Sequence, residues 1–142
     1  MTYVLKLPYE APPATTNDVR GNKGGKGHHM RQHIGHREVA ESIGWVAKAA
    51  KVPRLELCAI RLIWLLPGEP RVDNDALAVF LKAAKDGLVW AGVLEDDRCQ
   101  IVVEDRMRIV TGVGRDIAPA MLLEIEPLAG AMDVPDVWRT TR

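Results

Sequence analysis

The sequence has few of the features that mark specialised proteins. Its two cysteines, Cys58 and Cys99, have no paired spacing, which excludes a disulfide framework and a zinc ribbon. Aromatic residues make up 5% of the chain and the formal net charge is zero, so bulk charge indicates no nucleic-acid partner. The longest apolar run, residues 62–67, is too short to span a membrane, and residues 1–10 lack a signal-peptide layout. We therefore expect a cytoplasmic protein with no membrane partner and a buried, structural Cys58 thiol.

The bulk composition is that of an ordinary globular protein. The chain has 142 residues, of which 47% are apolar and 27% charged, enough for one domain with its own core. We expect a single domain over residues 1–127 and a loose tail over residues 128–142.

The charges are unevenly distributed along the chain. Residues 17–37 read as a basic, flexible loop, and residues 20–37 hold all four histidines but no Asp or Glu. Two interpretations stay open: a solvated loop, or a loop that becomes ordered on a phosphate backbone. We interpret the histidines as hydrogen-bonding or phosphate-facing side chains. The alternative for His29 and His33 is a transition-metal site, because histidines at i and i+4 of a helix can bind such a metal. The basic residues expected to contact DNA are Lys23, Lys26 and Arg31, together with Arg71 before the acidic motif.

Hydrophobic periodicity predicts an α/β protein of the mixed α+β kind. We expect a single mixed sheet of about four to five strands, with two main helices packed on it. The apolar run at 55–66 indicates a central strand, because apolar residues occupy both of its faces. The predicted helices are residues 37–51 and 75–91, and the other predicted strands are 3–7, 100–103, 106–111 and 121–126, with a turn at Glu104-Asp105.

Acidic residues occur at both ends of the second predicted helix. Asp73-Asn74-Asp75 precedes it, Asp96-Asp97 follows it, and Lys82 lies between them. Carboxylate oxygens are the hard ligands that Mg²⁺ prefers, and a substrate phosphate can complete the shell. Clustered carboxylates near one lysine are therefore a candidate site for cutting a phosphodiester.

The helical spacing places Asp75, Lys82 and Asp86 on one face, opposite an apolar stripe. Asp75 and Lys82 are then about 10 Å apart along the axis. Each residue also has an ordinary structural interpretation. Asp75 can be a helix N-cap, Lys82 and Asp86 a surface ion pair, and Asp96-Asp97 an exposed turn. We interpret Asp86 as structural. The predicted apolar stripe consists of Leu77, Leu81, Ala84 and Leu88.

Five short sequence elements follow one another between residues 71 and 97. They are Asp-x-Asp at 73–75, Lys82, Asp-Gly-Leu at 86–88, Ala-Gly-Val at 91–93 and Asp-Asp at 96–97. In residue type and spacing this stretch resembles the RusA family of Holliday-junction resolvases. The resemblance extends more loosely to the rest of the chain. Its further points are Asn17 in the Pro/Asn-rich N-terminal segment, the basic segment that follows, and Trp64 on the predicted strand before the motif.

The resemblance implies a homodimer in the bacterial cytoplasm, of cellular or phage origin, that binds four-way DNA junctions. Each subunit would nick one of two symmetry-related strands in recombination and repair, as a Mg²⁺-dependent endodeoxyribonuclease with Mn²⁺ as a substitute. Matched position by position, Asp73, Asp75 and Asp97 are the expected catalytic and metal-binding acids, with Asp96 as a secondary ligand. Lys82 is the expected catalytic lysine.

One position departs from the family pattern, which usually has Asn directly after the second Asp. Here Ala76 occupies that position, and Asn74 lies two residues earlier. The departure keeps a second hypothesis open, a branched-DNA-binding protein with impaired catalysis. A third hypothesis is a phosphohydrolase of small substrates, although a small substrate does not need a basic arm.

Overall fold

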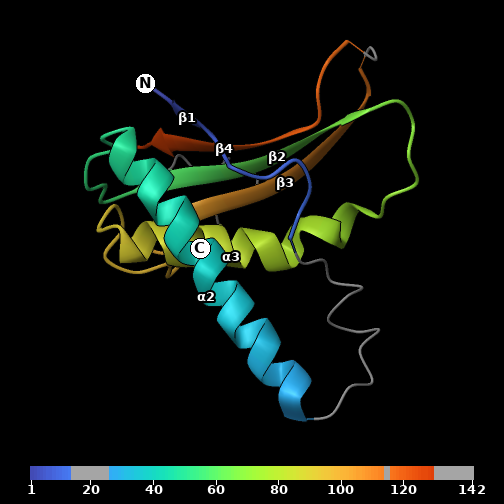
Figure 1. The fold of residues 1–142 in the computed structure, drawn as a ribbon. Coiled ribbons are helices and arrows are strands. Elements are labelled where there is room, and N and C mark those ends of the chain that lie inside the picture. The colour runs from blue at the N-terminus through green and yellow to red at the C-terminus, as the bar shows by residue number, and fades with distance from the viewer. Residues whose placement is uncertain (14–25, 114–115, 130–142) are drawn as a thin grey trace, which may run out of the picture.

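The computed structural model describes residues 1–13, 26–113 and 116–129 of the chain. Within these ranges the protein belongs to the α+β class, with one mixed four-stranded sheet and two helices (Figure 1). No helix in these ranges is long and apolar enough to cross a membrane. The elements are β1 (Tyr3–Lys6), α2 (Lys26–Ala49), β2 (Cys58–Pro67), the 3-10 helix η1 (Asn74–Leu77), α3 (Ala78–Trp90), β3 (Val102–Val113) and β4 (Ala120–Pro127).

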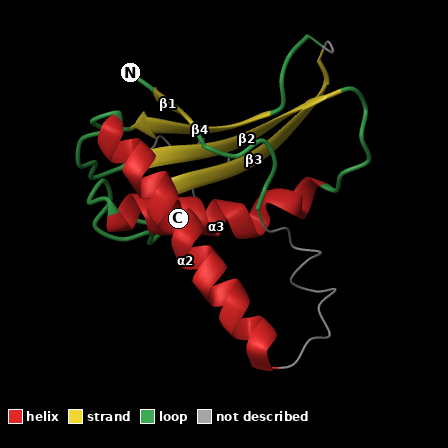
Figure 2. Cartoon of the chain, in the orientation of Figure 1, coloured by secondary structure: helices red, strands yellow, loops and turns green. Residues whose placement is uncertain are grey.

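The strands lie in the order β1-β4-β2-β3, with β2 parallel to β3 and antiparallel to β4. Figure 2 shows both helices on one side of this sheet. The side chains of β4 alternate, because Met121, Leu123 and Ile125 are fully buried while those between them are half-buried. The prediction of a central strand at 55–66 is confirmed by β2, which pairs on both edges. Cys58 is buried, and this burial raises the pKa of its thiol to about 11.

The prediction of two short strands around a turn at Glu104-Asp105 is wrong. Both residues lie inside the single long strand β3, where Glu104 pairs with Ala59 and Asp105 with Ile60 of β2. Acidic residues have low strand propensity, but cross-strand packing overrides that preference. The Asp105 carboxylate also accepts a hydrogen bond from Lys85 Nζ at 2.6 Å, which joins β3 to α3.

Helix α2 begins earlier than the sequence predicted. It starts at Lys26 rather than at residue 37, so the second half of the expected basic loop is helical. Its first turns extend away from the sheet and from α3 (Figure 1). Because adding a residue to an existing helix is far easier than nucleating one, the packed C-terminal half can propagate through residues 26–36, which contain no proline. The rest of the expected loop, residues 17–25, lies outside the described ranges.

The predicted helix at 75–91 divides into two parts. Its first turn is the 3-10 helix η1, and the α-helix proper is α3. The apolar stripe is confirmed, and Gly92 ends the helix with a φ of +79°, a conformation that suits glycine. Of the expected tail at 128–142, residues 130–142 lie outside the described ranges. The stripe residues Leu77, Leu81, Ala84 and Leu88 are all buried.

Two glycines set how closely α2 and α3 approach each other. A Cβ added at Gly87 would lie 2.3 Å from the Ala40 carbonyl oxygen, and one added at Gly44 would lie 2.8 Å from the Gly87 carbonyl oxygen. No side chain fits in either space. The helices therefore cross in backbone contact, and their outer faces form one continuous surface.

Candidate active site

The candidate site is centred on Lys82, in the middle of α3 on the face opposite the core. Its ammonium group donates a hydrogen bond to Asp97 and lies 3.0 Å from Asp86 Oδ1. The Lys82 side chain is 54% exposed, so a large substrate can reach it. These two carboxylates raise the pKa of Lys82 above its ordinary value of 10.5. The lysine is therefore cationic at neutral pH.

Asp97 reaches Lys82 because the chain reverses after α3. Val93 and Leu94 are buried in the core directly after the Gly92 turn, which holds the following segment against the helix. The hydrogen bond from Lys82 lowers the pKa of Asp97 below its ordinary value of 3.8. The Asp97 backbone N–H donates to Asp96 Oδ1 at 2.7 Å. Asp96 thus supports the position of its neighbour, while Asp97 carries the contact with Lys82.

His36 is a member of this cluster that the sequence analysis did not identify. Its Nε2 hydrogen-bonds Asp86 Oδ2 at 2.7 Å, while the other oxygen of the same carboxylate holds Lys82. The ion pair predicted between Lys82 and Asp86 is confirmed, and Asp86 also connects α2 to α3. His36 and Asp86 are 50 positions apart. Only the helix crossing brings them together, and a sequence pattern contains no signal for it.

The acidic pair before the helix lies at the start of the helical segment that carries Lys82. Asp73 precedes η1 in an extended conformation and makes no side-chain cap hydrogen bond. Asp75 lies inside η1, so the N-cap interpretation of this residue is wrong. Both residues are exposed. The structure brings Lys82, Asp97, Asp86 and His36 together, and it places Asp73 and Asp75 at the start of the same helical segment.

Whether a divalent cation fits this site depends on the chemistry of the Asp carboxylates around Lys82 and before the helix. Across residues 1–13, 26–113 and 116–129, no three His, Cys, Asp or Glu side chains gather into a metal-binding group. Mg²⁺, however, is commonly held by one or two carboxylates, with waters and substrate phosphates completing its shell. Exposed Asp73 and Asp75 and half-buried Asp97 are each single carboxylate donors of that chemical kind. Asp97 also stays ionised, because its pKa is lowered.

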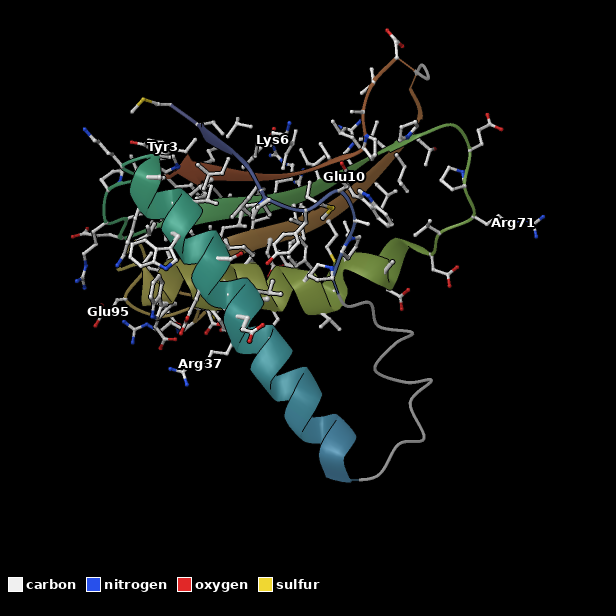
Figure 3. All side chains as sticks on the ribbon, viewed as in Figure 1. Tyr3, Lys6, Glu10, Arg37, Arg71 and Glu95 are labelled. Atoms are coloured by element: carbon white, nitrogen blue, oxygen red, sulfur yellow. The ribbon has the colours of Figure 1, made fainter. Side chains whose placement is uncertain are left out.

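The residues predicted to bind DNA are placed only in part. Arg71 is exposed in the loop before η1, and Figure 3 shows its side chain pointing away from the fold. Lys26 and Arg31 lie on the first turns of α2, but the structure does not describe their side chains. Lys23 lies outside the described ranges. The predicted phosphate contacts therefore stay predictions, as does a metal site at His29 and His33, whose side chains are likewise not described.

Two of the three comparisons with known proteins found no match. No protein-family model matches it, and no curated protein matches it. Among solved structures, it is similar to the hydrogenase maturation protein HypE, with 16% sequence identity and a TM-score of 0.30. The likeness covers 90% of this chain and 32% of that protein, so this chain spans about a third of its length. A likeness of this size carries no argument about fold or function.

Proposed function

We propose that this protein is a metal-dependent endonuclease that nicks branched DNA, with four-way junctions as its substrate and a homodimer as its working form. One observation carries the proposal. Lys82 and Asp97, 15 residues apart, form a direct ion pair on an exposed face. These two residues belong to different elements of the motif that resembles the RusA family. A lysine held by carboxylates on an open surface suits a phosphodiester in a large substrate.

The contacts of Lys82 suggest how it acts on a phosphate. An ammonium group has three N–H donors, and Asp97 and Asp86 account for two of them among the described residues. The third donor can face a phosphate oxygen, where it stabilises the negative charge that grows in the transition state. Asp97 and Asp86 orient the ammonium before the substrate arrives, and His36 orients Asp86. A bound Mg²⁺ would activate water and stabilise the leaving oxygen.

The test is cleavage of a labelled synthetic four-way junction with Mg²⁺, with Mn²⁺ and with EDTA. A linear duplex of the same length and an Asp97→Asn protein run alongside. We expect metal-dependent paired nicks in the junction alone, which disappear in the variant. Glu95→Gln is the matched control, because Glu95 is a neighbouring exposed acid whose described partners are Arg54 and Arg98. Nicking that survives in Asp97→Asn would show that this acid has been wrongly assigned.

A second candidate function is a junction-binding protein without catalysis, and Ala76 favours it. This residue is 7% exposed and its N–H bonds the Asp73 carbonyl at 3.1 Å. A methyl group at this position supplies no amide to the acids around it. Tight junction binding without nicking in either metal would support this candidate, and metal-dependent nicking would remove it. An Ala76→Asn variant that gains activity would identify the missing amide as the cause.

A further inference from the structure

Two tryptophans on the outer face of the helix pair are unusually exposed. Trp45 of α2 is 60% exposed and Trp90 of α3 is 42% exposed. Their rings meet edge to face, with centroids 5.4 Å apart and an interplanar angle of 66°. Large aromatic side chains seldom stay exposed without a reason, because burying one contributes on the order of 1.5–3 kcal/mol. This pair therefore has the character of a binding surface.

The backbone holds the pair in place. The ring atom Cε3 of Trp90 lies 2.4 Å from where a Gly44 Cβ would be, so only glycine lets the ring lie against α2. Trp45 follows directly on the same helix and contacts the ring from the side. The Trp90 ring is thus packed closely against α2, in a position where a flat ligand can meet the aromatic pair.

The charge beside the tryptophans favours an anionic ligand. Lys48 Nζ lies 4.6 Å from the Trp90 ring centroid and 5.1 Å from that of Trp45, within cation–π range. Within the described ranges it makes no ion pair with a carboxylate. Because a cation already lies over the rings, a second cation is disfavoured. A flat aromatic group joined to a phosphate matches both features.

Trp90 lies on the same face of α3 as the candidate active site. Lys82, Asp86 and Trp90 are spaced i, i+4 and i+8 on α3, so they share one face. His36, Gly44 and Lys48 form the facing row on α2, since His36 contacts Asp86 while Gly44 and Lys48 contact Trp90. Lys82 and Trp90 are about 12 Å apart along the axis. At the duplex spacing of about 3.4 Å per nucleotide that distance spans about three to four nucleotides of one strand, and fewer where the strand is extended and unstacked.

From this geometry we infer that Trp45, Trp90 and Lys48 form a base-stacking subsite for unpaired nucleotides that flank the phosphate at Lys82. The inference rests on the proposed function and adds a preference for branched DNA with unstacked bases. Stacking on an aromatic ring is tolerant of sequence, because every base has a π-face. Lys48 would contact the adjoining phosphate.

The experiment compares wild type, Trp45→Leu and Trp45→Phe in EDTA, where cleavage is suppressed. Binding is measured by fluorescence anisotropy for a forked duplex with an unpaired thymidine arm, a four-way junction and a blunt duplex. Leucine keeps the apolar character but removes stacking, and phenylalanine keeps stacking. We expect Trp45→Leu to lose about tenfold in affinity for the fork, Trp45→Phe to stay within about threefold, and the blunt duplex to be unaffected. Wild-type tryptophan emission should be quenched by the fork.

The possible failures are distinguishable. Equal fork affinity in wild type and Trp45→Leu would overturn the subsite while leaving the endonuclease proposal intact. An equal loss for fork and blunt duplex, or a tenfold loss in Trp45→Phe, would also overturn base stacking. A change in oligomeric state of Trp45→Leu without DNA would assign the surface to a contact between copies. If wild type binds none of the three DNAs, the proposed function fails and the subsite fails with it.

Discussion

The two faces of α3 differ in burial and in the contacts that they make. On the inner face Phe80, Leu81 and Leu88 are almost completely buried against the sheet. On the outer face Lys82 is exposed and Asp86 half-buried, and polar contacts connect them to α2 and to the loop after the helix. The inner face determines where the helix lies, because apolar burial is the larger energy. The outer face is then free to carry charges that contribute little to stability.

Phe80→Ala should give the largest effect on stability. Phe80 is 1% exposed, and its ring meets that of Tyr9 edge to face at 5.6 Å. Removing a buried ring leaves a cavity and costs about 3–5 kcal/mol. The free energy of unfolding is measured by urea titration, with Phe80→Leu as the control of nearer volume. A cost below about 1 kcal/mol for the alanine variant would contradict the assignment of the inner face.

Lys82→Ala should separate activity from stability. We expect junction nicking to fall by about 10²–10³-fold, the loss typical when one transition-state donor is removed. The free energy of unfolding should change by less than about 1 kcal/mol, because the ion pair is solvent-exposed. Lys85→Ala is the matched control, since Lys85 lies on the same helix but pairs with Asp105 of β3. A large loss of stability in Lys82→Ala would show that the two faces are coupled.

Gly87→Ala tests the crossing that joins the two helices. The new Cβ would meet the Ala40 carbonyl at 2.3 Å, so α2 and α3 must separate at a cost of about 1–3 kcal/mol. Gly35→Ala should have the opposite sign, because nothing lies within 4 Å of its Cβ position and alanine favours a helix by about 0.5–1 kcal/mol. Thermal unfolding of both variants gives the comparison. If the two glycines respond alike, close approach is not the reason for Gly87.

The pH dependence of the Lys82–Asp97 pair should be the smallest effect. The pKa of Asp97 is lowered below 3.8, so its contribution to stability is present above pH 3.8 and is lost as the pH falls through the lowered pKa. The pKa of Lys82 is raised above 10.5, so its contribution is present below pH 10.5 and is lost as the pH rises through the raised pKa.

The measurement is NMR titration of the Asp97 carboxyl group in wild type and in Lys82→Met. Its pKa should rise toward the ordinary value in the variant, because the hydrogen bond from Lys82 is the main cause of the lowering. An unchanged Asp97 pKa would mean that the two side chains do not pair in solution.

Local pattern was sufficient for much of the fold and part of the site. The stripe from Leu77 to Leu88 repeats at helical spacing and is buried, and Gly92 ends the helix. Lys82 and Asp86 pair because i, i+4 neighbours lie together on any helix. The errors came where partners are distant in sequence. Glu104 and Asp105 alone indicate a turn, but in the structure they pair with β2 as part of a strand. Residues 26–36 alone indicate a loop, but in the structure they continue the packed half of α2.

The sequence by itself determined the identity of the chemical groups, the apolar stripe of the helix, the apolar alternation of the strands, and the placement of Lys82 and Asp86 on one helix face. Each of these depends only on neighbours within two turns of a helix or on alternation along a strand. Only the tertiary structure decided that Asp97 folds back onto Lys82, that His36 supports Asp86, and that Gly44 and Gly87 let two tryptophans meet at the surface. These contacts depend on where buried faces settle against one another, and that position is a property of the whole core.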